Sequence, residues 1–264
     1  MIQFFLRSLK KLYKHRDLLW MWTQREIQIR YKQSVLGAGW AIVQPLVLMA
    51  MFSIVFSYFL KVASDGLPYP LFSYAAVLPW TLLATSLNFA IPSLVGNMNL
   101  VTKIYFPREI LPLGSIGAAV IDFLVAGVVF AGMMIWYRAP LTWNVLWAPV
   151  ILVVQLMLIV GIALPMSAMN VFFRDIRFII PLVLQLWMYA SPVIYPVSMV
   201  PEKWRGLYAL NPMVGILEGY RNALLRGESP MTVEFGISTG AAIVLLILGY
   251  GLFKRTEDRF ADII

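Results

Sequence analysis

The chain has 264 residues, of which 61% are apolar and 13% are charged, and its formal net charge is +8 at pH 7. Because soluble domains contain roughly 45 to 50% apolar and about 25% charged residues, this composition indicates an integral membrane protein with little room for a soluble domain. The chain has no cysteine and one histidine, which excludes disulfides, a cysteine nucleophile, a histidine-based metal site and a Ser-His-Asp triad.

The N-terminal residues 1–33 are basic and amphipathic. Apolar and basic side chains alternate at helical spacing over residues 1–14, which predicts a helix lying in the membrane interface, and a second helical segment follows it. Anchoring on the cytoplasmic side explains the eight Lys and Arg residues before the first span. A sharper interpretation adds contact of Arg25, Arg30 and Lys32 with an anionic lipid headgroup. The segment lacks the apolar core of a cleavable signal.

Long charge-free runs predict an all-α integral membrane protein, a single transmembrane domain over residues 1–264. It comprises cytoplasmic interface helices over 1–33, a bundle of six transmembrane helices over 35–253 and a cytoplasmic tail over 254–264. With the N-terminus inside, cytoplasmic segments carry 15 Lys and Arg residues and outer segments carry 6, so both termini are expected in the cytoplasm and the chain in the inner membrane. The expected spans cover residues 35–60, 71–95, 110–136, 146–171, 178–198 and 235–253.

The first cytoplasmic loop, 97–112, carries several large apolar side chains around Lys103. Such side chains need a surface to bury them. A docking helix for a cytoplasmic partner is one explanation, and burial against the chain's own N-terminal helix is another. The residues leave both open.

Asp122 is the only acidic residue well inside a span. A lone carboxylate in a membrane is costly and indicates function by default. A protonated or hydrogen-bonded packing residue is favoured over a proton relay, because no chain of ionisable partners is visible in the other spans. The same lack of charge pairs argues against ion coupling.

The stretch 186–220 is apolar enough to enter a membrane, but Pro192, Pro196, Pro201 and Pro212 break it. Each interior proline deletes a backbone hydrogen bond and costs about 3 kcal/mol, so one spanning helix is excluded. Two half-helices that dip into the membrane and return, forming an outer gate, are expected, because broken helices at membrane depth line a cavity or are buried in protein. An exposed loop with apolar anchors is the alternative.

Aromatic residues are dense in and just after the fifth expected span. They are Trp187, Tyr189, Tyr195, Trp204 and Tyr208. Interfacial belts account for many such residues. Aromatic faces also match the C–H face of a sugar ring, so a polysaccharide conduit is compatible with this pattern.

The phosphate-cradling pattern GxxxxGK[ST] is absent, because Gly-Lys occurs nowhere in the chain. The chain is therefore not itself a P-loop ATPase. Transport through it is passive, ion-coupled or driven by a separate subunit, and the apolar first loop offers such a subunit a place to bind.

Five segments together resemble the membrane permease subunits of ABC exporters for cell-surface polysaccharides, of the O-antigen, capsule and teichoic acid type. They occur in the expected order over nearly the whole chain. The segments are REIQIRYKQSVLGAGWAIVQPL (25–46), NLVTKIYFPREILPL (99–113), VFFRDIR (171–177), SPVIYP with LNPM (191–196 and 210–213) and RFADII (259–264).

The resemblance implies a homodimer of six-span subunits that carries two ABC-type ATPase subunits on the cytoplasmic side. The cargo would be a lipid-linked polysaccharide, often an undecaprenyl-diphosphate-linked glycan. This chain would be no enzyme and hold no cofactor, because ATP and Mg would bind to the partner subunit. No nucleic-acid partner is implied, and membrane lipid surrounds the complex.

The resemblance also implies roles for matching positions. The coupling segment to the ATPase would comprise Lys103, Ile104, Tyr105, Phe106, Pro107, Arg108 and Glu109. The substrate entrance, with the basic residues above as headgroup contacts, would comprise Arg25, Arg30, Lys32, Leu36 and Gly37. The outer gate and conduit would comprise the five aromatic residues above together with Ser191, Pro192, Pro196, Asn211 and Pro212. On this basis Glu109→Lys is expected to uncouple ATP hydrolysis from export while the fold stays intact.

Three other interpretations stay open. The first is a passive channel or small-solute permease without an ATPase. The second is an ABC exporter of drugs or lipids. The third is a membrane enzyme acting on lipid-linked sugars, which would need paired carboxylates; Glu202, Glu218 and Glu228 are the clustered acids on the expected outer face.

Overall fold

A computed structural model describes residues 13–103, 106–257 and 260. These residues form helices and connections and include no strand, in agreement with the predicted all-α class. The helix expected over residues 1–14 lies almost wholly outside the described residues. The α-helices are α2 (Arg16–Tyr31), α3 (Trp40–Phe52), α4 (Tyr69–Ala90), α5 (Ser93–Gly96), α6 (Met98–Lys103), α7 (Ile110–Trp136), α8 (Ala148–Phe172), α9 (Ile176–Tyr189), α10 (Glu202–Tyr208), α11 (Pro212–Arg221) and α12 (Val233–Thr256).

Short stretches of tighter or wider helix extend several of these elements. A π-helical segment continues α3 and another continues α11. These segments are Gly37–Gly39, Trp143–Trp147 and Val197–Met199 (3-10 helix) and Ser53–Phe59 and Asn222–Arg226 (π-helix).

Five helical stretches of the described chain are long and apolar enough to cross a membrane. They coincide with the first, second, third, fourth and sixth expected spans, and their ends differ from the expected ones by a few residues. Their bounds are Gly37–Phe59, Tyr69–Ala90, Ile110–Trp136, Trp143–Phe172 and Val233–Thr256. Charge-free runs therefore locate these spans well, because a helix that crosses the membrane needs about 20 consecutive apolar residues and other elements seldom do.

The fifth expected span, 178–198, is not one continuous helix. α9 has 14 residues, roughly 21 Å of helix, which is shorter than the ~30 Å hydrocarbon core of a bilayer. It ends at Tyr189 because Pro192 has no N–H to continue the ladder, and the residue before a proline avoids the helical region. The chain then turns into α10 and α11.

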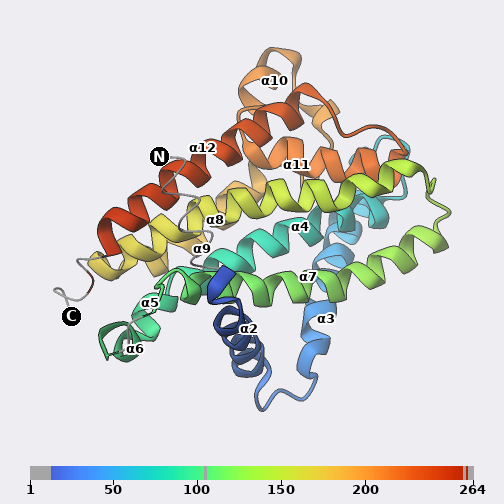
Figure 1. Ribbon diagram of the computed structural model, residues 1–264. Helices are drawn as coiled ribbons and strands as arrows, with labels where there is room; N and C mark the ends of the chain where they lie inside the picture. The colour runs from blue at the N-terminus through green and yellow to red at the C-terminus, as the bar shows by residue number, and fades with distance from the viewer. Residues whose placement is uncertain (1–12, 104–105, 258–259, 261–264) are drawn as a thin grey trace.

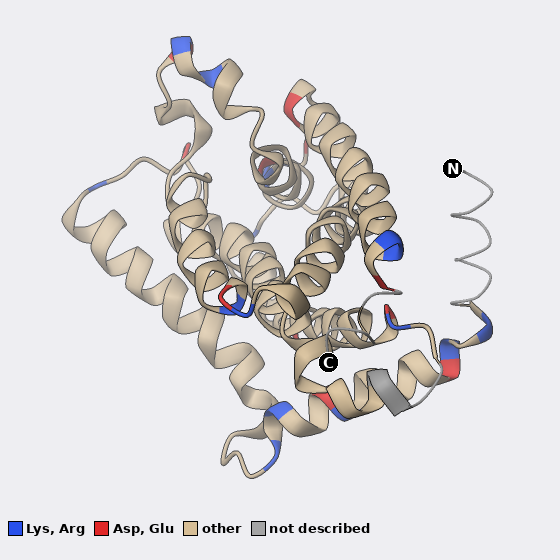
Figure 2. Cartoon of the chain, turned by 90° about the vertical axis from the view of Figure 1, so that its left-hand side faces the viewer, with Lys and Arg blue, Asp and Glu red and all other residues tan. Residues whose placement is uncertain are grey.

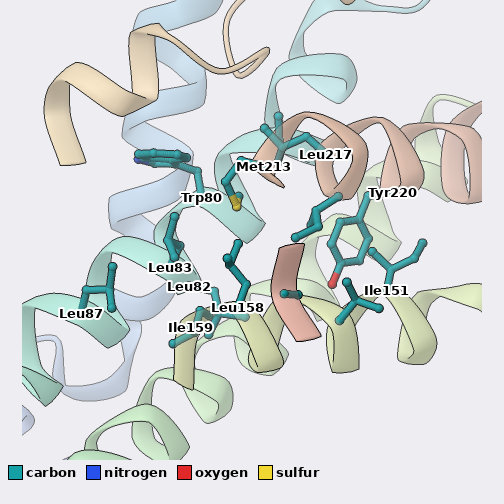
Figure 3. Packing of buried hydrophobic residues seen from close by; sticks show 14 of the residues in the cluster. Trp80, Leu82, Leu83, Leu87, Ile151, Leu158, Ile159, Met213, Leu217 and Tyr220 are labelled. Carbon is teal, nitrogen blue, oxygen red and sulfur yellow. The ribbon is translucent and has the colours of Figure 1, made fainter. Parts of the chain in front are cut away.

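α4 is the central helix of the bundle. In Figure 1 it lies between α7 and α8, with α11 beside it. In its most apolar window 78% of the residues are buried, against 6% for the first span. Figure 3 shows the core that results, in which Trp80 and Leu83 of α4 lie near Leu158 of α8 and Met213 of α11.

Glycine allows α8 and α12 to approach closely. A Cβ atom on Gly249 of α12 would collide with the backbone of Gly161 on α8, and a Cβ on Gly161 would meet the backbone near Leu245. Helices in membranes gain van der Waals contact in this way, because lipid supplies no hydrophobic force to press them together.

A buried glutamine connects three helices of the core. The Nε2 of Gln155 on α8 donates to the carbonyl of Pro79 on α4 at 2.6 Å, and its Oε1 accepts from the hydroxyl of Tyr220 on α11 at 3.3 Å. Polar side chains inside a bundle are stable when they find partners, and such bonds fix one arrangement of the helices.

Charged residues lie mainly near helix ends and connections, as Figure 2 shows, and long uncharged stretches separate them. α10 carries Glu202, Lys203 and Arg205 at the end of the bundle opposite α6. This distribution fits a bundle whose middle lies in hydrocarbon.

Candidate functional site

α2, the helix expected at the membrane interface, packs against the first half of α7. Trp22 lies against Gly114 and Thr23 lies against Gly117, so closely that a Cβ at either glycine would clash. Thr23 is buried, and its hydroxyl donates to the carbonyl of Leu19 at 2.9 Å. The small residues of α7 thereby bring the two backbones together and position the end of α2.

An ion pair joins the end of α2 to the middle of α7. Arg30 Nη1 donates to Asp122 Oδ2 at 3.0 Å, and the Tyr31 hydroxyl donates to Asp122 Oδ1 at 2.8 Å. Arg30 Nη2 donates to the carbonyl of Ser115 at 2.9 Å, and the guanidinium lies 4.0 Å from the ring centroid of Phe89. The Arg30 side chain is 6% exposed. Asp122 is therefore a hydrogen-bonded packing residue between helices, as the favoured interpretation predicted.

The surroundings keep both α2 residues in their usual protonation states. Burial raises the pKa of the Tyr31 hydroxyl, and its hydrogen bond to Asp122 adds to that effect, so Tyr31 stays a donor. Burial lowers the pKa of the Arg30 guanidinium while Asp122 opposes the change. An arginine nevertheless remains charged in proteins. The argument that charge pairs are absent from the spans is wrong, because the partner of Asp122 comes from α2.

The other residues of the expected entrance lie apart from this pair. Arg25 pairs with Glu26 at 3.6 Å and lies 4.3 Å from the ring centroid of Trp22. Lys32 and Leu36 are exposed after α2. Gly37 has φ +52°, a left-handed conformation that glycine adopts without strain, and it starts the turn into α3.

A cavity of about 560 Å³ lies between α2, α3, α4 and α7. Of the five expected entrance residues, only Arg30 lines it. Asp122 and Glu26 supply two carboxylates to its wall. Uncharged polar side chains and aromatic rings also line it, among them Gln44, Thr81, Thr85, Asn88, Trp40 and Phe89.

The expected coupling segment lies between α6 and α7 and is partly described. Lys103 is the last residue of α6, and Ile104 and Tyr105 lie outside the described residues. Phe106 packs against a cluster that includes Phe253 and Phe260 from the C-terminal part of the chain.

The residues that follow also contact the C-terminal part of the chain. Pro107 is buried, and Arg108 donates to the backbone carbonyl of Glu257 and lies 5.6 Å from the ring centroid of Phe260. Burial of this loop against the chain itself thus occurs on α12 and the tail as well as on α2, whose Trp22 packs on the same cluster as Phe106.

Glu109 points into the bundle, where it is fully buried. Its Oε2 accepts from Lys254 Nζ at 2.8 Å and its Oε1 accepts from the Tyr250 hydroxyl at 3.4 Å, both on α12. Lys254 also contacts Glu257 at 2.9 Å. These contacts argue against the expectation that Glu109→Lys leaves the fold intact, because the change would bury two ammonium groups side by side.

A second pocket, of about 420 Å³, lies between α9, α10 and the start of α11. It brings together five of the expected gate residues from three elements, with few polar groups in its wall. These residues are Trp187, Trp204, Tyr208, Asn211 and Pro212. Tyr189 is exposed outside the pocket, whereas Ser191, Pro192 and Pro196 are buried in the connection.

Asn211 is the main polar link of this region. Its Oδ1 accepts from Trp187 Nε1 at 2.9 Å and from the Met213 N–H at 3.0 Å, which caps α11. Its Nδ2 donates to the carbonyl of Ala190 and to Ser191 Oγ, both at 2.9 Å. The end of α9 is thus fixed to the start of α11 by one side chain.

Two tyrosines connect α10 to the preceding turn. The Tyr208 hydroxyl donates to that of Tyr195 at 3.1 Å, and the Tyr195 hydroxyl donates to the carbonyl of Tyr189 at 3.0 Å. Tyr208 lines the pocket, and Tyr195 is its hydrogen-bond partner outside the lining.

An ion network anchors α11 and escaped the sequence analysis. The fully buried Arg221 pairs with Glu218 at 2.8 Å, Glu218 also pairs with Arg226 at 3.0 Å, and Arg226 pairs with Asp65 at 3.1 Å. The spacing of Glu218 and Arg221 on a helix could have indicated the first pair. The contact with Asp65, 161 positions away, has no local signal.

The described residues contain no group of three or more His, Asp or Glu side chains that could hold a metal ion. Glu202 and Glu218, two of the acids considered for an enzyme, lie in ion pairs with arginines of their own helices, α10 and α11.

A family model described as ABC-2 type transporter matches residues 17–225 of the chain. The match includes nearly all of α2, residues 103–109 and the pocket around Asn211, and it ends before α12.

Two curated relatives match along nearly the whole chain. The O-antigen export system permease protein RfbA of Myxococcus xanthus is 29% identical over 260 residues, covering 97% of this chain and 99% of the relative. A protein of the same name from Klebsiella pneumoniae is 29% identical over 252 residues, 94% of this chain and 95% of the relative.

More distant relatives also match. The polysialic acid transport protein KpsM of Escherichia coli is 22% identical over 248 residues, which cover 89% of this chain and 91% of the relative.

Proposed function

The chain belongs to the ABC-2 type transporter family, and we propose that it is the membrane permease subunit of an ATP-driven exporter that moves a lipid-linked polysaccharide, most closely of the O-antigen type, across the cytoplasmic membrane. The observation that carries this proposal is similarity along more than nine tenths of the chain to permeases named for O-antigen export. The relative named only as an inner membrane transport permease, YadH of Escherichia coli (strain K12), matches 56% of the chain.

The proposed topology has six passages with both termini in the cytoplasm. The excess of Lys and Arg in the expected cytoplasmic segments supports this orientation. α9 is the short fifth passage, and the segment with α10 and α11 completes it as a re-entrant gate. Burial of Met213, Val214 and Leu217 on α11 supports that role, because a broken helix at membrane depth must be covered by protein.

The proposed energy source is a separate ATPase subunit that binds ATP and Mg and contacts residues 103–108. The complex contains two copies of each subunit. Because Glu109 is inside the bundle, it belongs to the chain's internal linkage and not to the docking surface. A force on the coupling segment would reach α7 directly and α12 through the pair of Glu109 with Lys254.

The path of the cargo follows from this arrangement. The lipid-linked glycan enters beside α2, passes between two permease copies and leaves past the region of α9 and α10. Closure of the ATPase subunits would move the coupling segments and separate the permeases. The pocket around Trp187 and Trp204 presents aromatic faces on which sugar rings can stack at the exit.

The experiment has two parts. The tagged chain is purified from native membranes in mild detergent, and the co-purifying proteins are identified and counted. A deletion strain is then complemented with the chain and tested for polysaccharide at the cell surface. We expect one P-loop ATPase per permease and restored surface polysaccharide. Recovery of the permease alone after crosslinking, with flux in liposomes lacking ATP, would overturn the proposal in favour of a channel.

A matched pair of variants locates the coupling surface. Tyr105→Ala should reduce ATPase recovery and export together, while Tyr58→Ala on the exposed part of the first span leaves both unchanged. Equal recovery with the two variants would contradict the assignment of the coupling segment.

A further inference from the structure

The cavity between α2, α3, α4 and α7 has chemistry that does not suit the diphosphate of a lipid carrier. Its wall contains the carboxylates of Glu26 and Asp122 and one guanidinium, that of Arg30. The guanidinium is already paired with Asp122 at 3.0 Å and donates to Ser115 as well. A phosphate group placed here would meet more negative than positive charge, and like charges repel.

One buried donor of this wall has no partner. Arg30 uses Nη1 and Nη2 for Asp122 and Ser115, and its Nε has no hydrogen-bond partner among the described residues. The side chain is more than nine tenths buried and lines the cavity. The Nε is itself buried, so the guanidinium is committed to its protein partners and offers no free charge to an anionic headgroup.

The remaining wall supplies what a sugar ring needs. Gln44, Thr81, Thr85 and Asn88 offer uncharged donors and acceptors for hydroxyl groups. Trp40 lines the same cavity, and its indole offers an apolar face for the C–H side of a ring. A volume of about 560 Å³ lies within the ~300–1,000 Å³ that is usual for small-molecule sites.

We propose that this cavity is a saccharide subsite. It binds an uncharged sugar unit of the transported glycan through the threonine hydroxyls, the side-chain amides and Trp40, and it leaves the diphosphate and the lipid outside. This inference depends on the proposed function, because it assumes a lipid-linked glycan as cargo. It changes the role expected for Arg30 from headgroup contact to a structural link between α2 and α7 at the wall of the subsite.

The test is photo-crosslinking in the complete transporter in cells that make the glycan. Trp40 is replaced by p-benzoylphenylalanine in the full chain, and Met51, which is exposed on the first span and does not line the cavity, is replaced in a control. After irradiation the purified permease is treated with mild acid, which cleaves the bond between sugar and phosphate. We expect glycan to stay on the protein at position 40 after acid and not at position 51.

Two outcomes would overturn the inference while the proposed function stands, provided that the variant still exports polysaccharide. Lipid that stays on the protein while acid releases the glycan would place the carrier in the cavity. Absence of any adduct at position 40 would show that the cavity does not bind the glycan. Loss of export in every strain, including the one complemented with the unaltered chain, would instead overturn the proposed function.

A second variant guards against a misfolded Trp40 protein. Thr85→Val keeps the shape of the side chain and removes its hydroxyl. Loss of one hydrogen bond predicts an increase of about 2- to 10-fold in the amount of lipid-linked glycan needed for half-maximal stimulation of ATP hydrolysis in the reconstituted complex. Thr239→Val, on α12 outside the cavity, is the matched control. An equal requirement with both variants would contradict the subsite.

Discussion

Two regions of the molecule hold their helices together by different chemistry. Around α7, ion pairs join residues far apart in sequence: Arg30 with Asp122 over 92 positions and Lys254 with Glu109 over 145. In the expected gate region, uncharged hydrogen bonds around the pocket between α9 and α10 join near neighbours, such as Asn211 with Trp187 over 24 positions and Tyr208 with Tyr195 over 13. The ion network of Glu218, Arg221 and Arg226 lies in the other part of this region, on α11 and its continuation.

This difference predicts which helices move together and which helix moves separately. Breaking one member of a buried ion pair is costly, so α2, α7 and α12 should move together when the coupling segment is pushed. Partly exposed neutral hydrogen bonds cost far less to exchange with water, so α10 can shift while the bundle stays intact. The predictions below test this contrast.

The largest effect is expected for the pair of Glu109 with Lys254. Lys254→Met leaves a fully buried carboxylate with only the hydroxyl of Tyr250 and should destabilise the chain by about 3 to 5 kcal/mol. Glu109→Leu should cost less, because Lys254 keeps its contact with Glu257. Thermal unfolding in detergent, followed by size-exclusion chromatography, measures both.

The double variant Glu109→Leu with Lys254→Met decides whether the cost comes from the unpaired charge. It should be more stable than Lys254→Met alone, because replacing both partners by apolar groups removes the buried charge. Lys203→Met on the exposed α10 is the control and should be neutral. If the double variant loses as much stability as the two single variants lose together, Lys254 acts through packing and not through its charge.

The next largest effect concerns the attachment of α2. Asp122→Asn keeps the shape of the side chain but removes the charge that Arg30 faces, which should cost about 1.5 to 3 kcal/mol. Because this pair joins α2 to α7, limited proteolysis should cut faster within α2 while the later spans stay protected. Asp17→Asn, whose side chain is exposed, is the matched control. Uniform loss of protection would mean that Asp122 supports the whole bundle.

A smaller and local effect is expected in the gate region. The chain has no cysteine, so Ala209→Cys places one reporter at a buried position beside Asn211. Asn211→Ala removes the bonds to Trp187 and Ser191 and should raise maleimide labelling of this reporter about fivefold, equivalent to roughly 1 kcal/mol. A reporter at Ala242 in α12 should be unaffected. Labelling that rises at both positions would show that the loss of Asn211 loosens the whole bundle and not the region of α10 and α11 alone.

The sequence predicts the spans but not the pairs that connect them. Five charge-free runs coincide with helices, whereas the expected fifth span, 178–198, runs past Pro192 although α9 ends at Tyr189. The five runs follow from local composition, and the end of α9 follows from the geometry of proline. The partner of Asp122 could not be found this way, because Arg30 lies on a helix with a different role and no periodicity relates the two.

Glu109 illustrates the same limit in the coupling segment. The family resemblance implied that Glu109 belongs to a docking surface, whereas its side chain points to Lys254, 145 positions later. Of the residues expected at the gate, Trp187, Trp204 and Tyr208 do meet in one pocket, and their role there stays a prediction. These residues contact partners that are close in sequence, so residues grouped in the sequence are also grouped in the structure.

The smallest effect is expected where the gate meets the connection between the first two spans. Asp65 and Arg226 are 29% and 22% exposed, and Arg226 keeps Glu218 when Asp65 is lost. Asp65→Asn should therefore cost at most about 1 kcal/mol, and added salt should reduce that cost by screening. Thermal unfolding at low and high salt measures it. A cost above that of Asp122→Asn would reverse the contrast, because the stronger of these two ion pairs would then hold the expected gate region and not α2.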